Sequence, residues 1–120
     1  MVVAVAPELN LREAQRYARR VAERWPLERA CLGGARVDDA HGAGEQRERG
    51  EEYLVVLVSD GFDGVPWLER VYVAESLWDA LEMGASVEAH CYTPVELVRR
   101  VESLPRVAAA VSEGIDLLAG

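Results

Sequence analysis

The chain has 120 residues, half of them hydrophobic, and a formal net charge of −8. This length and composition predict one folded domain with its own core, spanning residues 1–120. The negative charge disfavours non-specific nucleic-acid binding. All 13 basic residues are Arg, which excludes a P-loop lysine, a Schiff-base lysine and a lysine general base. With no apolar run near the ~18 residues of a membrane span and no signal-peptide pattern, we expect a cytoplasmic location and no membrane.

The first predicted element is a helix over residues 8–25. Its apolar residues recur at helical spacing, Asn10 can cap its start, and Pro26 ends it. A short strand follows over residues 28–32 and stops at Gly33-Gly34. Residues 35–50 are polar and rich in glycine, which predicts a long loop.

The second half alternates strands and helices. Residues 53–58, "YLVVLV", predict a strand buried on both faces. A helix is expected over 66–83, a strand over 86–92, and a capped helix from "TPVE" at 93–96. A short helix from Pro105 to Gly114 and a last strand in "IDLL" complete the chain. This order predicts a single α/β (α+β) domain with helices flanking a small mixed sheet.

Three stretches carry a resemblance to a known family. They are "CLGGARVDDA" at 31–40, "GEEYLVVLVSD" at 50–60 and "VEAHCYTPVELVRRVES" at 87–103. Over roughly residues 12–118 the sequence resembles the minimal nucleotidyltransferases, small members of the DNA polymerase beta-like superfamily. In that family a strand ends in Gly-Gly or Gly-Ser, a later strand carries Asp-x-Asp, and a third Asp follows on another strand.

The resemblance assigns a role to each matching position. Gly33 and Gly34 take the place of the phosphate-facing turn, and Glu51, Tyr53 and Glu88 take the places of the three metal-binding Asp residues. Arg36 follows the glycines and could reach a bound phosphate. These assignments predict that Glu51, Tyr53 and Glu88 converge on one cleft. They also predict that Cys31 and Cys91 lie two strands apart, about 9.6 Å, too far for a disulfide bond.

The metal chemistry of the family requires carboxylates that this chain lacks. Two Mg²⁺ ions bridge the nucleotide phosphates and the attacking oxygen, and Mg²⁺ prefers oxygen ligands. A phenol with an ordinary pKa of about 10 is neutral at pH 7 and offers one weak oxygen, so Tyr53 cannot replace a bridging Asp. We therefore expect a degenerate site and no cofactor, with Mg²⁺ required if the protein is active.

Two other arrangements of side chains could still form a metal site. Glu52 could bind metal if the strand slipped by one residue, which would turn its side chains to the opposite faces. Alternatively, Glu51, Glu88 and His90 could hold a softer transition metal such as Zn²⁺ or Mn²⁺. A histidine at a strand end without a metal role is the simpler interpretation.

Three functions follow from these observations. The first is a non-catalytic, antitoxin-like binding protein, because minimal nucleotidyltransferases commonly pair with a helical HEPN-type toxin. The second is an active enzyme that transfers a nucleotidyl group from an NTP to a protein or small molecule. The third is a ligand-free, self-associating homo-oligomer. The sequence identifies neither an acceptor nor a partner.

Overall fold

The computed structural model describes residues 9–40 and 52–119, with side chains from 9–37 and 52–119. The elements in chain order are α1 (Leu11–Ala22), β1 (Arg29–Gly33), α2 (Ala35–Ala40), β2 (Tyr53–Val58), the 3-10 helix η2 (Asp60–Phe62), α3 (Trp67–Ser76), α4 (Ala80–Met83), β3 (Val87–Tyr92), α5 (Pro94–Ser103), α6 (Pro105–Glu113) and β4 (Ile115–Asp116).

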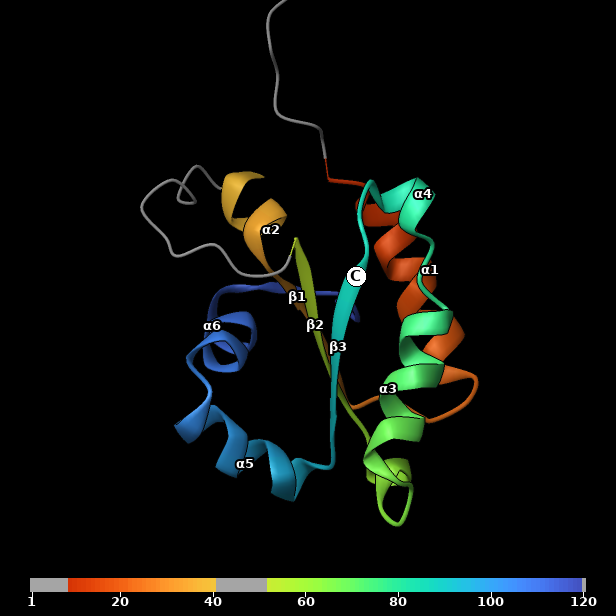
Figure 1. The fold of residues 1–120 in the computed structure, drawn as a ribbon, viewed down its shortest axis with the longest axis vertical. Helices are drawn as coiled ribbons and strands as arrows, with labels where there is room; N and C mark the ends of the chain where they lie inside the picture. Colours follow the sequence, from red (N-terminus) through yellow and green to blue (C-terminus); the bar gives the residue numbers. More distant parts are fainter. Residues whose placement is uncertain (1–8, 41–51, 120) are drawn as a thin grey trace, which may run out of the picture.

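The strands form one mixed sheet in the order β3-β2-β1-β4. β2 is parallel to β3, whereas β1 is antiparallel to both of its neighbours, β2 and β4. Helices α1, α3 and α4 lie on one side of the sheet and α5 and α6 on the other (Figure 1). The predicted fold class, a small mixed sheet flanked by helices, is confirmed.

Strand β2 lies at the centre of the core, and all six of its side chains are buried. Its side chains alternate between two hydrophobic clusters. Tyr53, Val55 and Leu57 pack with α1, and Leu54, Val56 and Val58 pack with residues of α5 and α6. The continuous apolar run therefore reflects burial on both faces, as the sequence predicted.

Local capping signals explain where α1 and α5 begin. The Asn10 side chain accepts a hydrogen bond from the Glu13 amide at 3.1 Å. Thr93 and Glu96 form a capping box, in which each side chain binds the other residue's backbone amide. Pro94 occupies the first turn, where its missing N–H costs nothing. Both helix starts are confirmed.

Two expectations about secondary structure are wrong. The loop predicted over 35–50 contains helix α2, directly after the Gly-Gly turn. The helix predicted over 66–83 is divided into α3 and α4, because the segment between them is held by other contacts. Trp78 is buried there and its indole donates to the Ala85 carbonyl at 2.8 Å. Asp79 then caps α4 by accepting from the Glu82 amide at 3.0 Å.

The strand order separates the two cysteines as expected. Cys31 lies on β1 and Cys91 on β3, with β2 between them. Both thiols are free and buried, and burial raises the pKa of Cys91 to about 12. Within the described residues, no helix is both long enough and apolar enough to cross a bilayer.

Candidate functional site

Tyr53 is the first residue of β2, and it is part of the packed core. Its side chain lies on the α1 side of the sheet, and its ring centroid is 5.2 Å from that of Trp78. The hydroxyl donates to the Met83 carbonyl at 2.8 Å. Burial raises the pKa of the Tyr53 phenol, so the group is neutral at pH 7. The hydroxyl at this position is therefore committed to the backbone that ends α4.

Glu88 lies on the opposite face of the sheet from Tyr53. In the parallel register of β2 and β3, Tyr53 is paired with Val87, and Glu88 with Leu54. Paired residues share a face, and successive residues of a strand point to opposite faces. The expectation that Tyr53 and Glu88 share one cleft is therefore wrong. Glu51 lies outside the described residues.

The Gly33-Gly34 turn has a packing role that accounts for both glycines. A Cβ on Gly34 would lie 2.7 Å from the Cα of Tyr53 and 2.7 Å from the Glu52 carbonyl oxygen. Gly34 also has φ of +107°, a conformation that side chains rarely adopt. A Cβ on Gly33 would lie 3.0 Å from the Cβ of Ala110. The turn thus packs closely on the start of β2 and on α6.

Arg36, the predicted phosphate-binding residue, connects the Gly-Gly turn to neighbouring backbone. Its Nε donates to Glu52 Oε1 at 3.2 Å, and one Nη donates to the Gly84 carbonyl at 3.1 Å. The guanidinium also lies 5.9 Å from the ring centroid of Tyr53. The predicted phosphate contact of Gly33, Gly34 and Arg36 stays a prediction.

Glu88 and His90 do lie together, and they form a hydrogen-bonded chain with Tyr92. His90 Nε2 is 2.5 Å from Glu88 Oε2, and His90 Nδ1 is 2.9 Å from the Tyr92 hydroxyl. A neutral imidazole satisfies both contacts when Nε2–H donates to the carboxylate and the phenol donates to Nδ1. Burial, the main cause, raises the pKa of Tyr92, so its hydroxyl keeps its proton for this bond.

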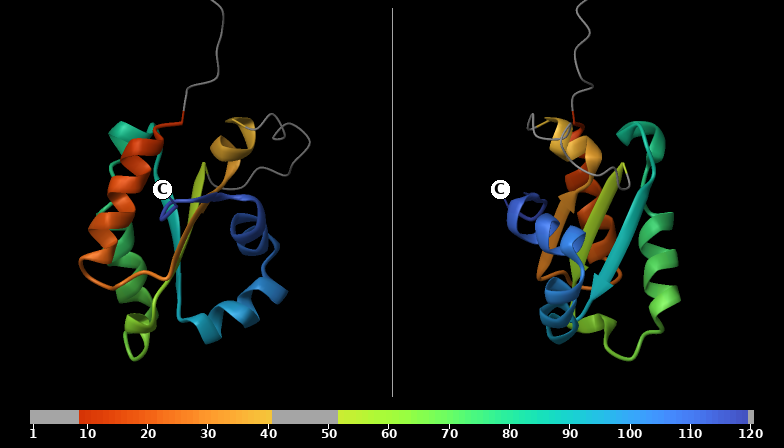
Figure 2. Two further views of the ribbon diagram at one scale, coloured as in Figure 1. Left: turned by 180° about the vertical axis from the view of Figure 1, so that it is seen from behind. Right: turned by 60° about the vertical axis from the view of Figure 1, so that its left-hand side comes forward.

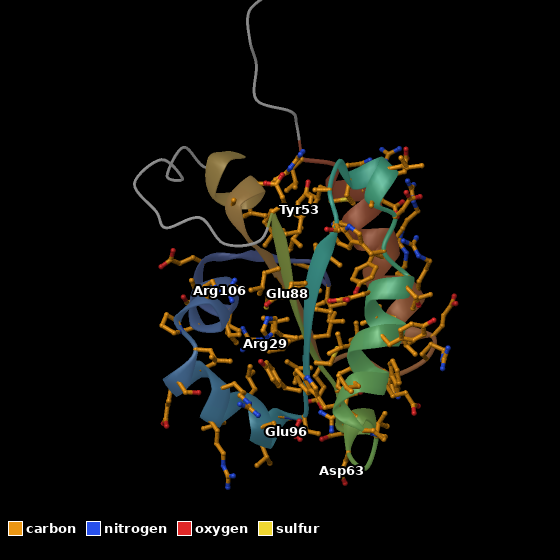
Figure 3. The ribbon with its side chains drawn as sticks, viewed as in Figure 1. Arg29, Tyr53, Asp63, Glu88, Glu96 and Arg106 are labelled. Atoms are coloured by element: carbon orange, nitrogen blue, oxygen red, sulfur yellow. The ribbon has the colours of Figure 1, made fainter. Side chains whose placement is uncertain are left out.

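Two members of this cluster, Tyr92 and Arg106, were not predicted from the sequence. Tyr92 follows His90 at the two-residue spacing of a strand, so alternation alone would have placed it on the same face. Arg106 on α6 lies 3.8 Å from the Glu88 carboxylate, a contact between residues 18 apart that no local pattern encodes. Figure 3 shows Arg106 on the side of the sheet that α5 and α6 cover, next to Glu88.

The chemistry of this cluster is limited by the burial of Tyr92 and by the side chains that could bind a metal ion. Tyr92 is buried, and its ring stacks on Trp67 with centroids 5.5 Å apart. Among the described residues, no group of three His, Cys, Asp or Glu side chains is placed to hold a metal ion. Tyr53 and Glu88, on opposite faces, do not fit the paired carboxylates that two Mg²⁺ ions need.

Comparisons with protein-family models, with curated proteins and with solved structures give no match for this chain.

Proposed function

We propose that this chain is a non-catalytic domain with a nucleotidyltransferase-like fold that acts by binding another protein. The resemblance to minimal nucleotidyltransferases implies that one strand ends in two glycines. It also implies that the central strand begins at the position of the family's Asp-x-Asp motif. The order of β1 and β2 agrees with this pattern, since β1 ends at Gly33 and β2 begins at Tyr53. The third expected strand, β3, lies directly beside β2.

The position of Tyr53 is the observation that supports a non-catalytic role. A buried, neutral phenol whose only proton is donated to the Met83 carbonyl is a much weaker ligand for Mg²⁺ than an ionised carboxylate. Glu88 is directed to the other face and contacts His90 and Arg106. Two-metal nucleotidyl transfer needs carboxylates that converge on the same ions, and these residues do not supply them.

Exposed apolar side chains on the helices support a role in protein binding. Leu68 and Tyr72 on α3 are 78% and 76% exposed, and Val95 and Val98 on α5 are 71% and 65% exposed. The partner we propose is a helical protein of the HEPN type, as the resemblance implies. The two free, buried cysteines are compatible with binding in the reducing cytoplasm.

The test is affinity purification of the tagged chain from its native cells, with the bound protein identified by mass spectrometry. We expect a helical HEPN-type protein in a fixed ratio to the chain. In parallel, the purified chain is mixed with Mg²⁺ and a radiolabelled NTP. Transfer of label to a protein or to a small molecule would overturn the proposal. A chain that purifies as a stable homo-oligomer without partner would overturn it in favour of the self-associating scaffold.

A further inference from the structure

The outer surface of α3 combines exposed apolar groups with negative charge. Leu68 and Tyr72 are four residues apart, so they are neighbours on one side of the helix. The buried residues of α3 are Arg70 and Ala74, and the partly buried Val73 packs against the core beside them. Leu68 and Tyr72 therefore point away from the fold and contribute little to its hydrophobic core.

The exposed charges of the chain segment that contains this pair all have the same sign, and the nearby cation Arg20 of α1 is bound to the Leu77 carbonyl where α3 ends. Between residues 60 and 82 every exposed charged side chain is a carboxylate, namely Asp60, Asp63, Glu69, Glu75, Asp79 and Glu82. The one arginine of this segment, Arg70, is buried, and its Nη1 donates to Glu96 Oε1 at 2.7 Å. Glu69 and Glu75 lie within one turn of Tyr72 on α3. The "α3 surface" is defined here as Leu68, Tyr72, Glu69 and Glu75.

The α3 helix is also held rigidly against the edge of the sheet. Arg70 donates to the Cys91 carbonyl at 3.2 Å, and Glu75 accepts from the Ala89 amide at 3.0 Å. These contacts occupy outward-facing backbone groups of the edge strand β3, which would otherwise be available to an added strand. Figure 2 shows α3 running alongside β3. A partner would therefore meet the side chains of a helix there.

We propose that the α3 surface binds a cationic amphipathic helix of a partner protein. An apolar stripe on that helix would cover Leu68 and Tyr72, and flanking Arg or Lys would approach Glu69 and Glu75. The negative charge disfavours nucleic acid and anionic membranes, which carry the same sign. It also opposes pairing of two α3 surfaces from two copies of this chain. The inference rests on the proposed binding function and specifies its site and the chemistry of its partner.

The test uses a synthetic helix in place of the partner. A labelled peptide of about 18 residues, five helical turns, carries Leu along one face and Arg on the rest. Two controls are a peptide with Glu in place of Arg and a scrambled peptide of the same composition without an apolar stripe. Binding to the full chain is measured by fluorescence anisotropy at low salt and at high salt.

We expect the Arg peptide to bind more tightly than both controls, and its affinity to fall as salt screens the carboxylates. Replacing Leu68 and Tyr72 together by Ser should weaken binding by about tenfold or more, as expected for central apolar contacts. Glu69→Arg should also weaken it. The matched control is Val95→Ser with Val98→Ser, a slightly less exposed apolar pair on α5 that is followed by Arg99 and Arg100. That control should bind the peptide like the parent.

Four results would overturn the inference. The first is equal binding of the Arg peptide and the scrambled peptide, which would show attraction by charge alone. The second is an equal loss of affinity in the α5 control. The third is a dimer in analytical ultracentrifugation that Leu68→Ser and Tyr72→Ser dissociate, which would make a second copy the occupant. The fourth is a protein with Leu68→Ser and Tyr72→Ser that still copurifies with its protein partner. In that case the binding function stands, but the α3 surface is not the binding site.

Discussion

Tyr53 and Glu88 point to opposite faces of the sheet, because Tyr53 is paired with Val87 in the parallel register of β2 and β3. Tyr53 packs in the α1 layer with its hydroxyl on the Met83 carbonyl, and Glu88 contacts His90 on the other side. Converting both positions to Asp would therefore place two carboxylates on different faces of one sheet. Such a change does not rebuild a two-metal site.

Tyr53→Asp should destabilise the fold. The substitution removes a buried aromatic ring and its hydrogen bond to the Met83 carbonyl, which a carboxylate cannot replace because both groups only accept hydrogen bonds. We expect a loss of about 3–5 kcal/mol in the free energy of unfolding, measured by urea denaturation. Tyr53→Phe, which removes only the hydroxyl, should cost about 1 kcal/mol. A Tyr53→Asp protein as stable as the parent would show that this position is not core.

Gly34→Ala should be more harmful than Gly64→Ala, although both glycines have positive φ. At Gly34 an added Cβ meets the Tyr53 Cα at 2.7 Å, whereas at Gly64 nothing lies within 4 Å. We expect roughly 1 kcal/mol for Gly64→Ala from backbone conformation alone, and more than about 2 kcal/mol for Gly34→Ala. Equal losses in thermal or urea unfolding would contradict the close packing of the Gly-Gly turn on β2.

The sequence predicted the elements whose signals are local. The apolar run of β2 and the "TPVE" start of α5 are examples, because burial on both faces and capping are each encoded within a few residues. The break between α3 and α4 depends on the Trp78 indole reaching the Ala85 carbonyl, which is a tertiary contact. The face of the sheet to which Glu88 points relative to Tyr53 depends on the register between β2 and β3. A shift of one residue in that register would turn Glu88 to the other face. No local pattern specifies that register, so the shared cleft was predicted incorrectly.

The Arg70–Glu96 pair should make the free energy of unfolding decrease as the solution becomes acidic. The Arg70 guanidinium, helped by the Thr93 backbone, holds the pKa of Glu96 below its ordinary value. A depressed carboxylate pKa stabilises the fold above the unfolded-state pKa, and this contribution is lost as pH falls through the folded-state pKa. Figure 3 shows Glu96 where β3 leads into α5.

The variant that isolates this pair is Glu96→Gln. Its amide oxygen can still accept the hydrogen bond from the Thr93 backbone amide in the capping box. Because the Glu96 side chain is 43% exposed, we expect a cost on the order of only 1 kcal/mol at pH 7. The difference from the parent should be smaller at pH 3 than at pH 7, because protonation of the carboxylate in acid removes its ionic contact with Arg70. Urea titrations at both pH values measure it, and a difference that grows in acid would contradict the pairing.

Alkaline pH should unfold the protein through its buried tyrosines. Burial raises the pKa of Tyr17, Tyr53 and Tyr92 above the ordinary value of 10. Their neutral forms are favoured in the fold, so this stability is complete below pH 10 and decreases as pH rises above it. Circular dichroism against pH should show cooperative unfolding in that range, accompanied by tyrosinate absorbance. Ionisation of all the tyrosines near pH 10 with the fold intact would be the contrary result.

The most direct test of the central claim is the thermal stability of the unmodified chain with Mg²⁺ and each NTP. A domain without a two-metal site should show no magnesium-dependent rise in Tm with any nucleotide. A working site at a hundred times its Kd would add about 2.7 kcal/mol, which amounts to several degrees for a domain of this size. A magnesium-dependent rise of that size, abolished by EDTA, would contradict the account.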